Sequence, residues 1–382
     1  MRLPLTAPVK PMLAQLTKTI PPAMAYEPKW DGYRCVVFRD GDEVTLFSRR
    51  GVDLTGYFPE VVAGVLDHSP TRCILDGELV VIRGDRLEFE RLSERCQPGA
   101  VRIAHLARTM PACFIAWDLL ALDDADLTGR PLVERRALLE AALDPAGELP
   151  ASATEATVAG ARGNPILLSP QTTDPEVARH WFDQFEGAGL DGVMAKPLDG
   201  RYLQGARAMY KVKHSREADV VVGAFVLHKN SSAADPLLGS LHFGLYADDD
   251  PDPATSDLHW VGVCSAFSEQ ARRQLLEILL PLTLNPGTPE YEAHPWSRPY
   301  VEGGARRPGM NSTWSKEKKD YYLLEPALVC QVVYEHMEGD RFRNTTRFGR
   351  WRPDKAPEDC TFEQLQEPVS YNLAEILANP AG

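Results

Sequence analysis

The alternation of apolar and polar positions in the first half of the chain predicts strands interrupted by a few helices. Residues 33–39 and 44–49 are predicted to form a hairpin, because Asp40-Gly41-Asp42 between them carries a turn signal. Residues 175–186 suit a helix with Asp174 as its N-cap and proline at its first position. The other elements expected before residue 214 are helices at 57–66 and 132–143, strands at 73–82 (broken at Asp76-Gly77), 112–122, 192–196 and 209–213, and irregular chain at 1–25 and 151–163.

A second, strand-rich part of the chain follows a boundary near residues 214–218. Residues 268–282 have the amphipathic pattern of a helix that begins at Ser268. Short strands with one helix between them favour a small closed barrel of the oligonucleotide-binding type, although a sandwich would have the same composition. The remaining expectations are strands at 219–227, 240–246, 259–266 and 327–336, an acidic loop at 247–257 and a long surface loop at 283–313.

Composition narrows the class of protein. The 382 residues allow about two to three domains, and 44% apolar with 25% charged residues is ordinary for globular proteins. No apolar run approaches the ~20 residues of a membrane span, and the N-terminus lacks a signal-peptide pattern, so a soluble cytoplasmic protein is expected. The net charge of −13 excludes a globally basic protein that coats nucleic acid, but it does not exclude a local basic face. The seven cysteines are scattered and none forms a Cys-x-x-Cys pair, which argues against a disulfide framework or a zinc ribbon. Most of them are expected to be buried in the core.

The most informative string, Glu27-Pro28-Lys29-Trp30-Asp31-Gly32-Tyr33-Arg34, stands at the entry to the predicted hairpin. A lone lysine in a loop is usually a solvated charge, and Lys-x-Asp-Gly occurs by chance in many proteins. Here other motifs follow it in order along most of the chain. They are Ser48-Arg49-Arg50-Gly51, Leu75-Asp76-Gly77-Glu78, Trp117-Asp118 in an apolar strand, Asp191-Gly192 followed by Lys196, Tyr210-Lys211-Val212-Lys213, and Arg350-Trp351-Arg352-Pro353-Asp354-Lys355.

Strand geometry makes two of these motifs more specific. Lys211 and Lys213 lie on one face of a strand, and such like charges are unfavourable unless an anion lies between them. Asp191 and Lys196 differ in parity, so a bend at Gly192 must bring both into one site. Taken singly, each later motif also has an ordinary interpretation: a turn acid, a core tryptophan or a solvated strand.

The ordered set resembles the covalent nucleotidyltransferases, which include ATP-dependent DNA ligases, RNA ligases and mRNA capping enzymes. The resemblance implies an α+β nucleotidyltransferase (adenylation) domain with antiparallel sheets at 1–214, and a C-terminal OB-fold β-barrel with a tail at 215–382. It also implies that Lys29 attacks the α-phosphate of a nucleotide and forms a lysyl–nucleotide bond. Two residues depart from the family pattern: Trp117 replaces a usual Phe or Tyr, and Asp191 replaces a usual Glu.

The resemblance further implies a role for each motif residue. It places Glu27 and Trp117 at the adenine, and Arg34, Arg49 and Glu78 at the ribose, the DNA phosphate or a metal. Lys196, Lys211 and Lys213 are expected at the α-phosphate, Arg352 and Lys355 at the pyrophosphate leaving group, and Glu78 and Asp191 near a divalent metal. That metal is expected to be Mg²⁺ or Mn²⁺, because the phosphates of ATP must be neutralised.

Within this family the chain most resembles the compact bacterial ATP-dependent DNA ligases, namely ligase C and the ligase domain of ligase D. The C-terminal Arg-x-Asp-Lys and the string Glu325-Pro-Ala-Leu-Val-Cys-Gln-Val332 carry this part of the resemblance. ATP is the expected donor, because NAD-dependent ligases need an extra N-terminal domain and a cysteine zinc site, and only 28 residues precede Lys29. The expected activity is the sealing of nicks in duplex DNA, in DNA repair.

Three alternatives stay open at this point. An RNA ligase or a capping-type nucleotidyltransferase would share the first five motifs. A non-catalytic OB-fold nucleic-acid-binding protein would need none of the Lys29 set, and a nucleotide-binding regulator would bind without turnover. The expected partners are nicked duplex DNA and repair proteins such as a primase or polymerase, and no membrane is expected. The protein is expected to be a monomer associated with the nucleoid.

Overall fold

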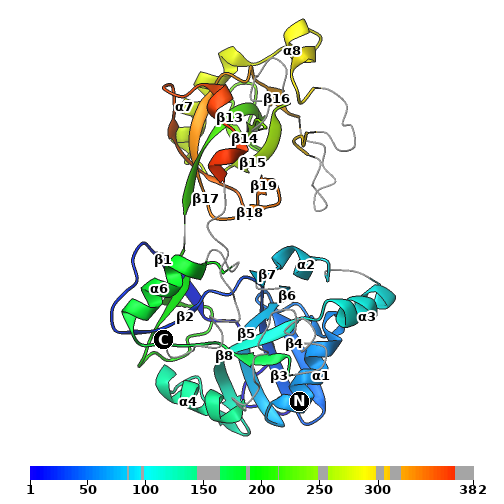
Figure 1. Ribbon diagram of the computed structural model, residues 1–382, viewed down its shortest axis with the longest axis vertical. Coiled ribbons are helices and arrows are strands. Elements are labelled where there is room, and N and C mark those ends of the chain that lie inside the picture. Colours follow the sequence, from blue (N-terminus) through cyan, green and yellow to red (C-terminus); the bar gives the residue numbers. More distant parts are fainter. Residues whose placement is uncertain are drawn as a thin grey trace. The chain divides into compact units, whose positions relative to one another are not determined.

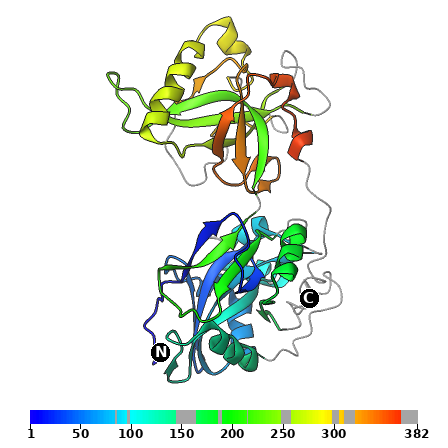
Figure 2. The same ribbon diagram turned by 90° about the vertical axis from the view of Figure 1, so that its left-hand side faces the viewer.

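The computed structural model describes residues 1–83, 86–95, 99–143, 164–185, 190–213, 215–247, 257–297, 305–309 and 320–365. The chain forms two compact units, with the division between His214 and Ser215 (Figures 1 and 2). The predicted limits of the two domains, 1–214 and 215–382, stay predictions. No helix in the described part of the chain is long and apolar enough to cross a membrane.

Two mostly antiparallel sheets build the first unit. One sheet has the order β1-β12-β11-β2, and the other has the order β10-β8-β5-β3-β4 with β9 beside β8. Two pairings are parallel: β1 with β12, and β10 with β8. The strands are β1 (Leu13–Thr17), β2 (Met24–Pro28), β3 (Tyr33–Asp40), β4 (Glu43–Ser48), β5 (Arg72–Val80), β8 (Cys113–Leu122), β9 (Ala125–Asp126), β10 (Ile166–Leu168), β11 (Val193–Pro197) and β12 (Arg207–Val212), with a separate pair β6 (Ile82–Arg83) and β7 (Arg86–Leu87).

Helices cover these sheets, and their apolar faces explain where they pack. In α1 (Pro59–His68), Val61 and Val65 are buried in a cluster with residues of β3, β5 and β8. α6 (Pro175–Phe185) begins as predicted, since the Asp174 carboxylate accepts a hydrogen bond from the Glu176 amide at 2.8 Å. The other helices of this unit are α2 (Phe89–Ser93), α3 (Ala100–Thr109) and α4 (Leu132–Ala142), with a 3₁₀ turn η1 (Thr55–Tyr57).

Two sequence predictions for this unit were wrong, and α2 and α3 were not predicted. Residues 1–25 are not wholly irregular, because β1 pairs with β12, a strand about 190 residues later that no local pattern reveals. The strand at 73–82 is not broken at Asp76-Gly77. β5 runs through these residues, and the irregularity is a shift of register on its neighbour β8. The loop predicted at 151–163 lies outside the described residues.

The second unit is built on a single six-stranded sheet. Its order is β15-β14-β13-β17-β20, and β16 pairs with β13. The helix α7 (Glu269–Leu279) is capped as predicted, because Ser268 Oγ accepts from the Ala271 amide at 3.2 Å. Its strands are β13 (Arg216–Leu227), β14 (Leu238–Leu245), β15 (His259–Cys264), β16 (Tyr322–Leu323), β17 (Val329–Tyr334) and β20 (Arg347–Trp351), with the pair β18 (Met337–Glu338) and β19 (Arg341–Phe342).

This sheet curls, and its two edge strands meet at one point. A parallel bridge joins Cys264 to Thr346, and the Thr346 amide donates to the Val263 carbonyl at 2.9 Å. No continuous ladder of hydrogen bonds links β15 to β20 among the described residues. The two edges of the expected barrel are therefore connected by this bridge and not by a full pairing of strands. The loop expected at 283–313 contains a short helix, α8 (Pro289–Ala293), and 3₁₀ turns lie at η3 (Leu280–Leu282), η4 (Pro357–Asp359) and η5 (Phe362–Leu365).

Apolar side chains fill the space between the elements of each unit. In the first unit, one buried cluster joins β2, β5, β8 and β11 and contains Trp30 and Trp117. A second cluster joins β3, β5, β8 and β12 through Val36, Ile74 and Met209. These contacts pack the two sheets against each other and fix the strands that carry the motifs. The six cysteines in the described residues are free and buried, as expected: Cys35, Cys73, Cys113, Cys264, Cys330 and Cys360.

Candidate active site

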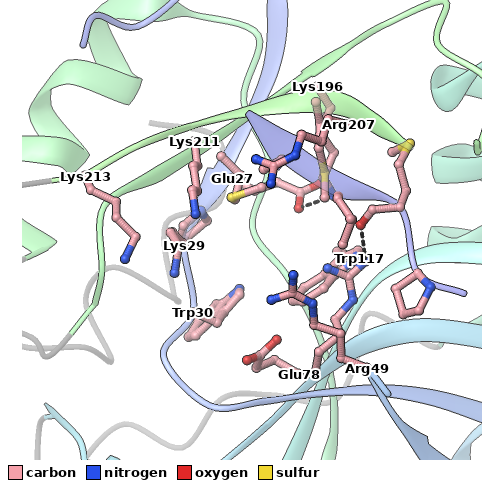
Figure 3. Close-up of a pocket in the computed structure, with 18 residues that line it drawn as sticks. Glu27, Lys29, Trp30, Arg49, Glu78, Trp117, Lys196, Arg207, Lys211 and Lys213 are labelled. Carbon is pink, nitrogen blue, oxygen red and sulfur yellow. Dashed lines mark hydrogen bonds and ion pairs between the residues drawn. The ribbon is translucent and has the colours of Figure 1, made fainter. Parts of the chain in front are cut away.

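A cavity of about 350 Å³ lies between the two sheets of the first unit. Lys196 and Arg207 reach it from one sheet, while Arg49 and Glu78 lie on the opposite wall (Figure 3). The structure thus brings together most of the residues predicted from the motifs. Those that line the cavity are Glu27, Lys29, Arg34, Arg49, Glu78, Trp117, Lys196, Lys211 and Lys213.

Lys29 is fixed at the cavity by its main chain. Its amide donates to the Gly192 carbonyl at 2.8 Å, and its carbonyl accepts from the Asp191 amide at 2.9 Å. Gly192 has φ +124°, and a Cβ there would stand 2.1 Å from the Val212 carbonyl oxygen. Only glycine fits this position. Strand parity predicted a bend here that would bring Asp191 and Lys196 into one site, whereas the structure pairs Asp191 with Lys29 and Lys196 with Glu27.

One carboxylate holds two ammonium groups beside this backbone junction. Lys29 Nζ forms an ion pair with Asp191 Oδ2, and Lys213 Nζ lies 2.9 Å from the same oxygen. Lys213 follows β12 directly, so the pair links the end of that strand to the end of β2. Asp191 therefore acts as a counter-ion in this arrangement, and a metal would have to compete with both lysines for it.

A second ion pair forms a buried part of the cavity wall. Lys196 Nζ lies 2.6 Å from Glu27 Oε2, and these side chains are only 4% and 1% exposed. The same ammonium lies 5.4 Å from the centroid of the Trp117 ring. In the register of β11 and β2, Met194 faces Glu27 directly. Lys196 is thus grouped with the aromatic end of the cavity, away from the Lys29–Asp191–Lys213 cluster.

A β-bulge explains why Trp117 reaches the cavity. On β5, Asp76 pairs with Asp118 and the next residue, Gly77, pairs with Ala116, so Trp117 is the extra residue of β8. The bulge is held from behind by a buried ion pair, because the Arg135 guanidinium of α4 lies 2.8 Å and 2.9 Å from the two Asp118 oxygens. Asp118 therefore supports the wall of the cavity without lining it.

Arg34 is held by two residues that had no predicted role in the site. Its guanidinium lies 2.6 Å and 2.5 Å from the two oxygens of Asp76, and 4.5 Å from the Trp117 ring centroid. Tyr202 donates its hydroxyl proton to Asp76 at 2.7 Å. Asp76 had a usable signal, since it stands two residues before Glu78 and shares its strand face. Tyr202 had none, because its contact spans 126 residues.

Glu78 lies opposite Arg34 in the register of β5 and β3 and lines the cavity. Burial raises the pKa of its carboxyl group to about 8, and the positive charges of Arg34 and Lys29 oppose that shift. Within the described residues its carboxyl group has no hydrogen bond or ion pair. It is thus the cavity carboxylate left open for a cation.

The carboxylates fit a metal that takes most of its ligands from elsewhere. The described residues contain no group of three acidic, histidine or cysteine side chains able to enclose an ion. Mg²⁺ usually keeps several waters and binds through one or two carboxylates plus substrate phosphates. Glu78 meets that requirement, whereas Asp191 is already occupied by two lysines.

The two predicted residues of the second unit have different surroundings. Arg352 is held by carboxylates on either side, with Nη1 2.8 Å from Asp219 and Nη2 2.8 Å from Asp354. Lys355 has no ion pair with any described residue, although its amide donates to the Arg352 carbonyl at 3.1 Å. The sequence analysis also did not single out Ser169 and Gln171, two polar residues that follow β10.

Comparisons with known proteins point to one family. A sequence model described as the ATP dependent DNA ligase domain matches residues 8–213. DNA ligase C2 of Mycolicibacterium smegmatis is 46% identical over 373 residues, which cover 96% of this chain and 97% of that protein. The multifunctional non-homologous end joining DNA repair protein LigD of Mycobacterium tuberculosis is 29% identical over 343 residues, 89% of this chain and 37% of LigD.

A solved structure supports the fold. It comes from a structure–function study of Lig E DNA ligases that describes DNA binding with a minimal scaffold, and it matches with a TM-score of 0.50 at 17% identity. The match covers 89% of this chain and 99% of that one, and therefore includes both units.

Proposed function

The chain belongs to the family of ATP-dependent DNA ligases, and on that premise we propose that Lys29 carries the AMP with which it seals nicks in duplex DNA. The observation that carries this assignment is the position of Lys29 at a cavity with cations at one end and an aromatic, ion-paired wall at the other. Such a cavity suits a molecule with a flat base and a charged phosphate chain.

The aromatic end is proposed to hold the adenine. Glu27 offers an acceptor and Lys196 a donor side by side, which complements the 6-amino group and the adjacent ring nitrogen of adenine. Trp117 provides the face for stacking. This proposed role of Lys196 replaces the expected contact with the α-phosphate, and the support for it is the pairing of Lys196 with Glu27 beside the tryptophan.

The cationic end is proposed to hold the α-phosphate. Lys211 and Lys213 project there, and their charges stabilise the negative charge that develops during transfer. The bond from Lys29 Nζ to phosphorus forms as the bond to pyrophosphate breaks. The AMP then passes to the 5′-phosphate of the nick, and the 3′-hydroxyl displaces it to close the strand.

The other predicted residues keep their proposed places. Arg34 and Arg49 act on the ribose or the DNA phosphate, and Arg352 and Lys355 act on the departing pyrophosphate. Glu78 would hold a Mg²⁺ or Mn²⁺ ion together with the phosphates of ATP, with Asp191 nearby. The ion would neutralise phosphate charge, which is the chemistry it supplies in such sites.

The biological setting is proposed from the relatives. LigD is by its name a multifunctional repair protein, so we infer a role in DNA repair together with other repair proteins, such as a primase or polymerase. The chain is proposed to act as a monomer.

Incubation with ATP labelled at the α-phosphate tests the proposal. Wild-type protein should take up the label, Lys29→Ala should not, and the adduct should map to Lys29. Lys229→Ala, which removes an exposed lysine of the second unit, is the matched control and should label normally. Label from GTP in place of ATP would indicate a capping-type enzyme. Sealing of nicked RNA but not DNA would indicate an RNA ligase, and label without sealing would indicate a regulator.

A further inference from the structure

A four-residue segment ties the two sheets of the first unit together beside Lys29. This strap, Ser169–Thr172, lies between β10 and α6. The Ser169 amide donates to the Ala116 carbonyl of β8 at 2.8 Å. At its other end, Thr172 exchanges two main-chain hydrogen bonds with Tyr26 of β2, at 3.0 and 2.7 Å. The strap is thus fixed to both walls of the cavity.

Two side chains of the strap hold the residues that flank Lys29. Ser169 Oγ accepts from the indole nitrogen of Trp30 at 3.0 Å, and Gln171 Nε2 donates to Glu27 Oε1 at 2.7 Å. Because a carboxylate can only accept, the amide nitrogen of Gln171 must face Glu27. The strap therefore acts on the side chains before and after the nucleophile.

Gln171 completes the restraint on Glu27. Lys196 binds Oε2 and Gln171 binds Oε1, so both oxygens of a carboxylate that is 1% exposed are held. One donor alone leaves a carboxylate free to turn about its terminal bond, since that torsion is broad. Two donors from different elements fix its plane, and with it the direction of the remaining lone pairs.

We propose that Gln171 is a positioning residue for nucleotide selection, holding Glu27 so that a free lone pair accepts from the 6-amino group of adenine. The inference rests on the proposed function of the cavity. A fixed carboxylate accepts a hydrogen bond from a 6-amino group and repels a 6-oxo group. If the carboxylate can turn away, the Lys196 ammonium faces the 6-substituent of the base instead, and a donor at that place favours a 6-oxo base.

The test compares three nucleotides in single-turnover self-labelling, read by mass spectrometry of the covalent adduct. They are ATP, purine riboside 5′-triphosphate, which lacks the 6-amino group, and inosine 5′-triphosphate, which carries a 6-oxo group. A hydrogen bond to a charged partner contributes about 1.5–3 kcal/mol, so wild type should prefer ATP over the purine riboside analogue by about 10- to 150-fold. In Gln171→Leu this preference should fall at least threefold, and labelling by inosine triphosphate should rise relative to ATP.

Two further variants separate positioning from a general loss of structure. Ser169→Ala loosens Trp30 on the same strap but leaves Glu27 bound, so its preference for ATP over the analogue should equal that of wild type. Gln171→Asn is one methylene too short to reach Glu27, and it should behave like Gln171→Leu; it decides the matter if the leucine variant does not fold.

Different results would overturn the role of Gln171 and the proposed function of the cavity. An unchanged preference in both Gln171 variants overturns the inference while the function stands. An equal drop in Ser169→Ala also overturns it, because the effect would then belong to the strap as a whole. A wild-type protein that takes no label from ATP overturns the proposed function itself.

Discussion

Arg352 and Asp219 form an ion pair in which Nη1 lies 2.9 Å and 2.8 Å from the two carboxylate oxygens. The other side of the same guanidinium binds Asp354, and this contact lowers the pKa of Asp354 to about 2. Arg352 is therefore fixed between β13 and its own loop, and its charge is matched by two acids. Lys355 has no ion pair with a described residue, so it is the more available cation of this motif.

We predict that Arg352→Ala slows self-labelling from ATP by about 100-fold, the usual loss for one electrostatic contact to a leaving or developing charge. Sealing of a nick already adenylylated at its 5′ end should be spared, because no pyrophosphate leaves in that step. Asp219→Asn should give the same pattern with a smaller loss, since it removes only the partner that fixes Arg352. Arg273→Ala, on α7, is the control. Equal loss of both steps would indicate a folding or DNA-binding role.

The second prediction concerns Asp191. Asp191→Asn removes the anion that holds Lys29 and Lys213 in place, so the displaced nucleophile should be labelled at least about tenfold more slowly, while the Mg²⁺ concentration for half-maximal activity stays the same. Asp191→Glu should retain much of the activity. A Mg²⁺ titration of each variant measures this. An asparagine variant that needs more metal would make Asp191 a direct ligand, and an unaffected one would make it structural.

Motif residues were predictable from sequence where their geometry is local. Strand parity between Asp191 and Lys196 pointed to an unusual backbone at Gly192, and Gly192 has a positive φ. The two side chains nevertheless join different ion pairs. Long-range contacts were not predictable. Gln171 reaches Glu27 across 144 residues, and a glutamine after an apolar run has no distinguishing pattern. Strand parity gives the face on which Lys196 lies but not its partner. The pairing with Glu27 was not predictable, because it depends on which strand lies beside β11.

A buried ion pair gives the third prediction. Arg135 and Asp118 are each 1% exposed, so Arg135→Met leaves an uncompensated carboxylate and should lower the free energy of unfolding by about 3–5 kcal/mol. Asp118→Leu together with Arg135→Met should recover much of that loss, since no buried charge remains. Burial already raises the pKa of Asp118, and loss of the arginine raises it further. The deficit of Arg135→Met should therefore be smaller at pH 5 than at pH 8. Urea denaturation at both pH values measures it, and a pH-independent deficit would contradict the argument.

Glu78 provides the last prediction, for protein kept metal-free with a chelator. Its pKa of about 8 in the folded protein exceeds the value of about 4.3 for an exposed glutamate. Between these values the folded state holds a proton that the unfolded state has lost, so stability falls as pH rises from about 5 to 8. Glu78→Gln lacks this dependence, and its melting temperature relative to wild type should therefore rise over that range. Glu277→Gln, at an exposed position on α7, is the control.

Adding Mg²⁺ should stabilise wild type more at pH 8 than at pH 5, and should not stabilise Glu78→Gln in this way. A constant difference between wild type and Glu78→Gln across pH would mean that the carboxylate is already ionised, and an equal Mg²⁺ effect in both proteins would remove Glu78 from the metal site.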